Sequence, residues 1–162
     1  MQQPFEQVVS EHAAVVLRVC RFVVGMNDAE DAWMETFISA MRAYPDLPPD
    51  ANVQAWLVRI AHNRSIDLVR SRGRQPIPIA DLPDRIDDIG QTSGEHHDIW
   101  ILVGELPPKQ RQAIAYHYLG GLPFREVAEV LGGTPEAARK AASDGVKALR
   151  ITINSAQRKA TA

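Results

Sequence analysis

The sequence predicts an all-α protein of two small helical domains joined by a flexible linker, with a helix-turn-helix in the second domain. Apolar residues recur at close to helical spacing through most of residues 5–71 and again through residues 98–150. Between these parts, residues 73–98 concentrate glycine, proline and acidic residues. In the second half, glycine-containing turns separate helical segments, one of which begins with a strong capping signal.

Two helices are predicted at the beginning of the chain. The first covers residues 5–24, where valines recur at helical spacing, and Gly25 begins a short break. Asn27 or Asp28 can cap a second helix that runs to about Ala43, with acidic residues in its first turn. The side chains expected to face a core from these helices are Val8, Val9, Val15, Val16, Val19, Val23, Trp33, Phe37, Ala40 and Met41.

A third, long helix and the linker follow. Residues 44–50 carry three prolines and are predicted to form a loop, after which a helix covers about residues 53–71. Its expected buried stripe is Val53, Leu57, Ile60, Ala61 and Leu68. The proline-rich and glycine-rich acidic segment that comes next cannot bury enough apolar surface to order itself. We therefore expect a first domain at residues 1–74 and an acidic linker at residues 75–97.

The second domain is expected at residues 98–162. Short helices are predicted at residues 98–105 and 109–119, the second one begun by two prolines. A helix-turn-helix then covers residues 123–150. In it, Pro123 takes the first position of one helix, and Thr134 caps the next, which is followed by a frayed tail. An ordinary helical hairpin is the alternative interpretation of this pattern.

Charge is distributed unevenly along the chain. The formal net charge of −2 argues by itself against a nucleic-acid-binding protein. However, residues 1–53 carry −5, residues 54–80 carry +4, residues 81–104 carry −5 and residues 105–162 carry +4. The mean thus hides two basic segments, which are candidate phosphate-binding surfaces.

Several classes of protein are disfavoured. No segment approaches the roughly 20 apolar residues that span a bilayer, and the N-terminus does not resemble a signal peptide. The single cysteine, Cys20, excludes an intramolecular disulfide and is expected to be buried. His96 and His97 have no partners at metal-ligand spacing, and His117 is expected in a half-buried aromatic cluster. We expect a cytoplasmic protein without catalytic residues, bound metal or cofactor.

The long third helix carries residue types that suit nucleic acid. Arginines contact phosphates, asparagine can read a base edge, and tryptophan can support an unstacked base. The residues of this kind on or near one face, and just beyond the helix, are Trp56, Arg59, Asn63, Asp67, Arg70, Arg72 and Arg74. Alternatively, Trp56 belongs to the core and the arginines only solvate the end of the helix.

The order of these segments resembles the extracytoplasmic-function (group 4) sigma factors of bacterial RNA polymerase. The pieces that carry the resemblance are residues 28–37 (DAEDAWMETF, the family's DAEDxxQExF), 55–63 (AWLVRIAHN, for AWLxxIAxN), 67–70 (DLVR, for DxxR), 106–111 (LPPKQR, for LPxxxR) and 121–132 (GLPFREVAEVLG, for GxxxxEIAxxLG). They stand in the family's order, and the resemblance in the order of segments extends across nearly the whole chain.

The resemblance implies a role for each matching residue. Asp28, Glu30, Asp31 and Glu35 are expected to bind the core polymerase. The minus-ten promoter element is expected to meet Trp56, Arg59, Asn63, Asp67 and Arg70, with Arg72 and Arg74 near the backbone. Thr134, Arg139 and Lys140 of the last helix are expected to meet the minus-thirty-five element. Core polymerase and promoter DNA are thus the expected partners, and an anti-sigma factor is an optional one.

The chain departs from the family's pattern at four positions. Met34 replaces the glutamine before Glu35. In the last helix, Ala141 and Asp144 stand where arginines are usual, and Gly145 lies inside the helix. These departures predict weak or altered reading of the minus-thirty-five element. Two alternatives follow: a sigma-derived interaction module, or a helix-turn-helix repressor that acts without polymerase.

Overall fold

The computed structural model describes residues 2–73 and 94–161, and no side chain of residues 94–98. These residues form helices and connecting turns without a strand, which confirms the predicted all-α class. The helices are α1 (Phe5–Val24), α2 (Ala29–Ala43), η1 (Tyr44–Asp46), α3 (Val53–Gly73), α4 (Gly94–Glu105), α5 (Pro108–Ile114), η3 (Ala115–Leu119), α6 (Phe124–Leu131) and α7 (Pro135–Ala160). Among them, none is both long and apolar enough to cross a bilayer.

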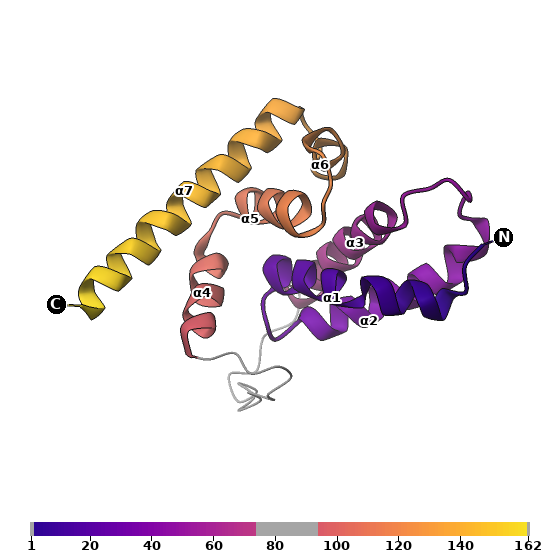
Figure 1. Ribbon diagram of the computed structural model, residues 1–162, viewed down its shortest axis with the longest axis horizontal. Helices are drawn as coiled ribbons and strands as arrows, with labels where there is room; N and C mark the ends of the chain where they lie inside the picture. Colours follow the sequence, from indigo (N-terminus) through magenta and orange to yellow (C-terminus); the bar gives the residue numbers. More distant parts are fainter. Residues whose placement is uncertain (1, 74–93, 162) are drawn as a thin grey trace.

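Helices α1, α2 and α3 form the first domain around a core of their own (Figure 1). Its buried members are Val8, Val16, Cys20, Ala29, Ala32, Phe37, Ala40, Tyr44, Leu57 and Ala61. Cys20 is fully buried as predicted, and burial raises the pKa of its thiol to about 12. Met41 was expected on the buried stripe of its helix, and this prediction is wrong because its side chain is exposed.

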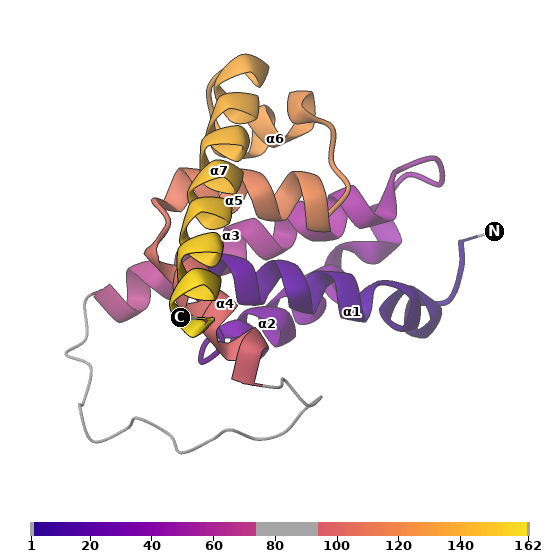
Figure 2. The ribbon, with the colours of Figure 1, turned by 60° about the vertical axis from the view of Figure 1, so that its left-hand side comes forward.

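In the second domain, α6 and α7 form the predicted helix-turn-helix (Figure 2). Thr134 caps α7 as expected: its Oγ1 accepts a hydrogen bond of 3.1 Å from the backbone N–H of Ala137. The expected frayed tail is wrong, since α7 continues to Ala160.

Other boundaries also differ from the prediction. Helix α4 begins at Gly94, inside the segment expected as linker, while residues 74–93, including Arg74, lie outside the described residues. The helix expected over residues 109–119 is α-helical only to Ile114 and continues as the π-helix η3. Pro123 is the cap of α6 rather than its first residue.

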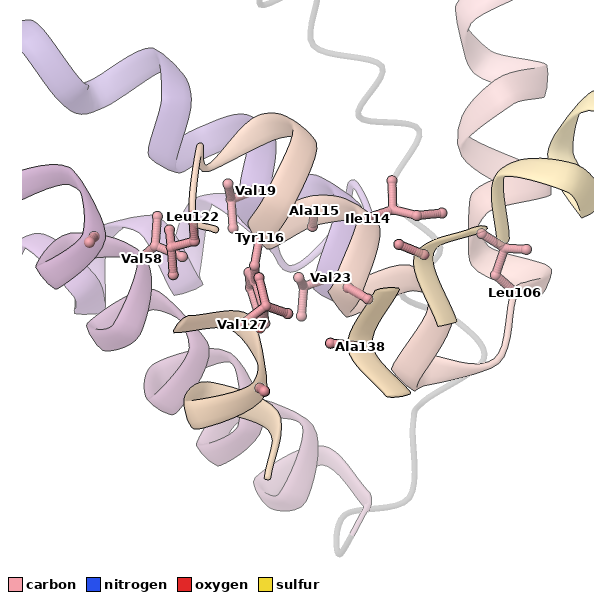
Figure 3. Close-up of a cluster of buried hydrophobic side chains, with 14 residues drawn as sticks. Val19, Val23, Val58, Leu106, Ile114, Ala115, Tyr116, Leu122, Val127 and Ala138 are labelled. Atoms are coloured by element: carbon pink, nitrogen blue, oxygen red, sulfur yellow. The ribbon is translucent and has the colours of Figure 1, made fainter. Parts of the chain in front are cut away.

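The first and second domains share a second apolar core, which the sequence did not indicate. Val19 and Val23 of α1 and Val58 of α3 are buried together with Tyr116 and Leu122 of the second domain (Figure 3). Their exposed fractions are all 5% or less. The described parts of the two predicted domains are therefore packed against each other.

Helix α7 crosses α5 closely at Gly145, and this contact explains the glycine inside the helix. A Cβ at this position would lie 2.6 Å from Cδ1 of Ile114. We expect Gly145→Ala to lower the free energy of unfolding by about 1–2 kcal/mol, because overpacking outweighs the better helix propensity of alanine. Chemical denaturation of the full chain measures the change.

The matched control is Gly104→Ala in α4, where a Cβ would meet nothing within 4 Å. This substitution should leave stability unchanged or raise it by up to about 1 kcal/mol. Equal effects of the two substitutions would contradict the packing explanation for Gly145.

Candidate polymerase and nucleic-acid interfaces

Helix α2 presents a face that is both acidic and apolar. Glu30, Asp31 and Glu35, three of the predicted polymerase-binding residues, are exposed on it. The apolar residues beside them are Met34, Ile38 and Met41, with exposed fractions of 54%, 37% and 55%. Their spacing of four and three residues places them on one stripe, opposite the buried face of the helix.

This apolar stripe was missed in the sequence. Met41 was assigned to the core and Met34 was treated only as a departure from the family pattern. The signal was present, because Met34, Ile38 and Met41 recur at helical spacing out of phase with the small buried residues Ala32 and Ala40.

Asp28 and Asp31 are tied to the end of α3 by an arginine. Arg72 lies 2.7 Å from Oδ1 of Asp28 and 3.4 Å from Oδ2 of Asp31. Burial raises the pKa of the Asp28 carboxyl, which the charge of Arg72 opposes. The structure thus brings Arg72, which was predicted to lie near DNA, to the acidic end of α2.

A polar row runs along α3, as the spacing predicted. Its exposed members are Arg59, Asn63, Asp67 and Arg70, and Arg64 pairs with Asp67 at 3.1 Å. Trp56, at the start of the row, is only half-exposed: it packs against the first-domain core, with its ring 6.2 Å from that of Tyr44. This position favours a structural role for Trp56, the alternative left open by its sequence.

The second domain contacts one end of this polar row. Arg59 pairs with Glu129 of α6 at 3.1 Å. Next to it, the buried His62 lies with Nδ1 2.6 Å from the hydroxyl of Tyr116. Burial lowers the pKa of His62 and raises that of Tyr116, so both groups are held neutral in this contact.

Helix α7 carries a basic row on its free side. The exposed residues at helical spacing are Glu136, Arg139, Lys140, Ser143, Lys147 and Arg150. Arg139 lies over the ring of Phe124, 5.3 Å from its centroid. Ser143 and Lys147 were missed in the sequence, although they follow Lys140 by three and by seven residues, the spacing of one helix face.

The departures in α7 concern packing more than this exposed row. Gly145 is buried against α5, and Ala141 packs on the apolar core that the domains share. Asp144 is half-buried, between the packed side of α7 and its exposed basic row. An arginine at position 141 would therefore start from the packed side of the helix, so the absence of one there says little about DNA binding.

The histidines considered for other chemistry are accounted for only in part. His117 stacks on Phe124 at 3.7 Å, and its Nδ1 donates a hydrogen bond of 2.7 Å to the carbonyl of Leu122. The predicted half-buried aromatic cluster is thus confirmed. The side chains of His96 and His97 lie outside the described residues. Elsewhere in residues 2–73 and 99–161, no group of three potential metal ligands is found.

Comparisons with known proteins agree with this arrangement. Residues 8–75 match Sigma-70 region 2 and residues 97–149 match Sigma-70 region 4. The RNA polymerase sigma factor CarQ of Myxococcus xanthus is 30% identical over 159 residues, which cover 92% of this chain and 88% of CarQ. The ECF sigma factor SigE of Mycolicibacterium smegmatis is 32% identical over 79% of this chain, and the match spans only 53% of SigE.

Two solved structures share the fold over both domains. CnrH in complex with the cytosolic domain of CnrY superposes with a TM-score of 0.67 at 26% identity, covering 93% of this chain and 88% of CnrH. The sigma factor RpoE of Bartonella quintana, solved with the anti-sigma factor NepR, gives a TM-score of 0.69 at 20% identity over 92% of this chain and 98% of RpoE.

Proposed function

This chain belongs to the extracytoplasmic-function family of RNA polymerase sigma factors, and we propose that it binds core RNA polymerase and directs promoter recognition, strand opening and transcription initiation. The observation that carries the proposal is that the chain has two exposed rows suited to DNA, a polar row on α3 and a basic row on α7. These rows lie in the segments that match Sigma-70 regions 2 and 4.

The α2 face is the proposed polymerase-binding surface. Glu30, Asp31 and Glu35 would meet a basic surface, while the stripe of Met34, Ile38 and Met41 would bury apolar area against it. A face of this mixed kind gives orientation through charge and affinity through burial. Asp28 is more enclosed, and we assign it the role of holding Arg72 and thereby the end of α3.

The α3 row is the proposed minus-ten surface. Asn63 would read a base, and Arg59 and Arg70 would contact the backbone or flanking bases. Asp67 would orient Arg64 within the same row. Capture of unstacked bases offsets an unstacking cost of a few kcal/mol, so opening needs no covalent step, and we assign no catalytic residue.

The α7 row is the proposed minus-thirty-five surface. Arg139, Lys140, Ser143 and Lys147 would enter or flank the major groove, with Thr134 fixing the start of the helix. Gly145 packs against α5 and Ala141 packs on the core that the domains share. These two residues therefore no longer favour the alternative of a sigma-derived interaction module that does not read promoters. A repressor acting without polymerase would leave the exposed acidic and apolar face of α2 without a role.

A further partner is suggested by the solved relatives. CnrH was solved with CnrY and the Bartonella factor with an anti-sigma factor. We propose that an anti-sigma factor also regulates this chain. We further propose that the chain itself acts in the cytoplasm, together with its polymerase.

Competition for the core polymerase tests the proposal. The full chain should form a one-to-one complex with core enzyme on size-exclusion chromatography and should displace a labelled sigma factor from it. A chain that neither co-elutes nor competes at micromolar concentration would contradict the proposed function.

A further inference from the structure

The side chain of Arg139 is held by the other helix of the helix-turn-helix. Arg139 lies in the second turn of α7, and its guanidinium carbon is 5.3 Å from the centroid of the ring of Phe124, the first residue of α6. At this distance the face of an aromatic ring attracts a guanidinium cation. No ion pair of the described residues includes Arg139, so the ring orients this side chain there without competition from a carboxylate.

The ring of Phe124 is itself held in place. The ring of His117 stacks on it, with the two centroids 3.7 Å apart and the planes 16° from parallel. His117 is fixed in turn, because its Nδ1 donates a hydrogen bond of 2.7 Å to the carbonyl of Leu122, whose side chain is 1% exposed. Phe124 also packs against the apolar core that the domains share. The ring therefore offers Arg139 a support that is anchored in the folded domain.

An arginine that is oriented before binding is better suited to reading a base than a free one. The side chain is long and flexible, and ordering it on binding opposes affinity. Guanine accepts two hydrogen bonds from an arginine, at O6 and N7, and the planar guanidinium must be aligned with both. Arg139 lies near the start of α7, the part of a recognition helix that meets base edges.

We propose that Phe124 is a positioning residue for promoter reading: supported by His117, its ring orients Arg139 so that the guanidinium meets a base edge, a guanine by preference, in the minus-thirty-five element. This inference rests on the proposed minus-thirty-five role of α7. Phe124 touches no base in this arrangement and acts through Arg139. Its replacement should therefore change DNA binding only while Arg139 is present.

A double-mutant cycle on the full chain, bound to saturating core polymerase, tests this dependence. Its members are the wild type, Phe124→Leu, Arg139→Ala and the double variant, and leucine keeps apolar bulk on the shared core. The probe is a fluorescent duplex promoter that carries the minus-thirty-five sequence selected by the wild-type holoenzyme from a randomised library. Affinity is measured by titration, and the selection is repeated with each variant.

We expect Phe124→Leu to weaken binding about threefold and Arg139→Ala about tenfold. In the Arg139→Ala background, Phe124→Leu should change affinity by less than about 1.5-fold. Phe124→Tyr keeps the aromatic face and should remain within about 1.5-fold of the wild type. In the selections, Phe124→Leu and Arg139→Ala should relax the preference at the same base pair, which a loss of packing alone would not produce.

Leu131→Ala is the matched control, because Leu131 is another residue of α6 that packs against the shared core. Any loss of binding that this substitution causes through packing should be the same with and without Arg139. It should also leave the base preference unchanged.

Two outcomes would overturn the inference and leave the proposed function standing. One is wild-type affinity in Phe124→Leu. The other is an equal loss from Phe124→Leu in the presence and in the absence of Arg139, which would make the role of the ring purely structural. Wild-type affinity in Arg139→Ala would instead remove the minus-thirty-five role of this arginine, and the inference would fail with it.

Discussion

Asn63→Ala is expected to lower open-complex formation by about tenfold, because one base contact of this kind is worth about 1–3 kcal/mol. Asn63 is exposed in the middle of the α3 row, so its removal should leave the fold intact. The base preference at the minus-ten element should also relax. Arg70→Ala should instead weaken binding to all sequences and lower the salt dependence by about one phosphate contact.

Permanganate footprinting of promoter complexes separates these two outcomes. Asn154→Ala, which removes an exposed asparagine near the end of α7, is the matched control and should open promoters like the wild type. Equal opening by wild type and Asn63→Ala would remove the base-reading role from this residue.

Glu35→Arg is expected to weaken binding of the core polymerase by tenfold or more, because it places a like charge against the proposed basic surface, which costs several kcal/mol. Asp31→Arg should have a similar effect, and it also breaks the contact with Arg72. Glu35 is therefore the cleaner probe, since its carboxylate is in no ion pair of the described residues.

Equilibrium titration of labelled chain with core polymerase measures the effect. Asp50→Arg, in the exposed loop before α3, makes the same charge change in the same domain and should leave affinity within about twofold. Wild-type affinity in both the Glu35 and Asp31 variants would place the polymerase surface elsewhere.

Local signals in the sequence were enough to predict most helices. The valine spacing gave α1 with both ends as observed, and Thr134 with Pro135 marked the start of α7. These features act within one or two turns, so they can be recognised without knowledge of distant contacts. The one-sided polar row of α3 followed from spacing in the same way.

Features that depend on packing were not predicted. Gly145 looked like a defect in the last helix until α5 was placed against it. The shared core of Val58 with Tyr116 joins segments far apart in the sequence, so no local pattern indicates it. The residues that the second domain covers on α3 could therefore not be recognised.

The most direct test of this account is run-off transcription by purified core polymerase and the full chain from a library of promoter sequences. The account predicts transcripts that depend on the chain, start at defined positions and select common minus-ten and minus-thirty-five elements, and it predicts their loss with Glu35→Arg. Transcription that is equally low with and without the chain, although the chain binds core polymerase, would contradict it.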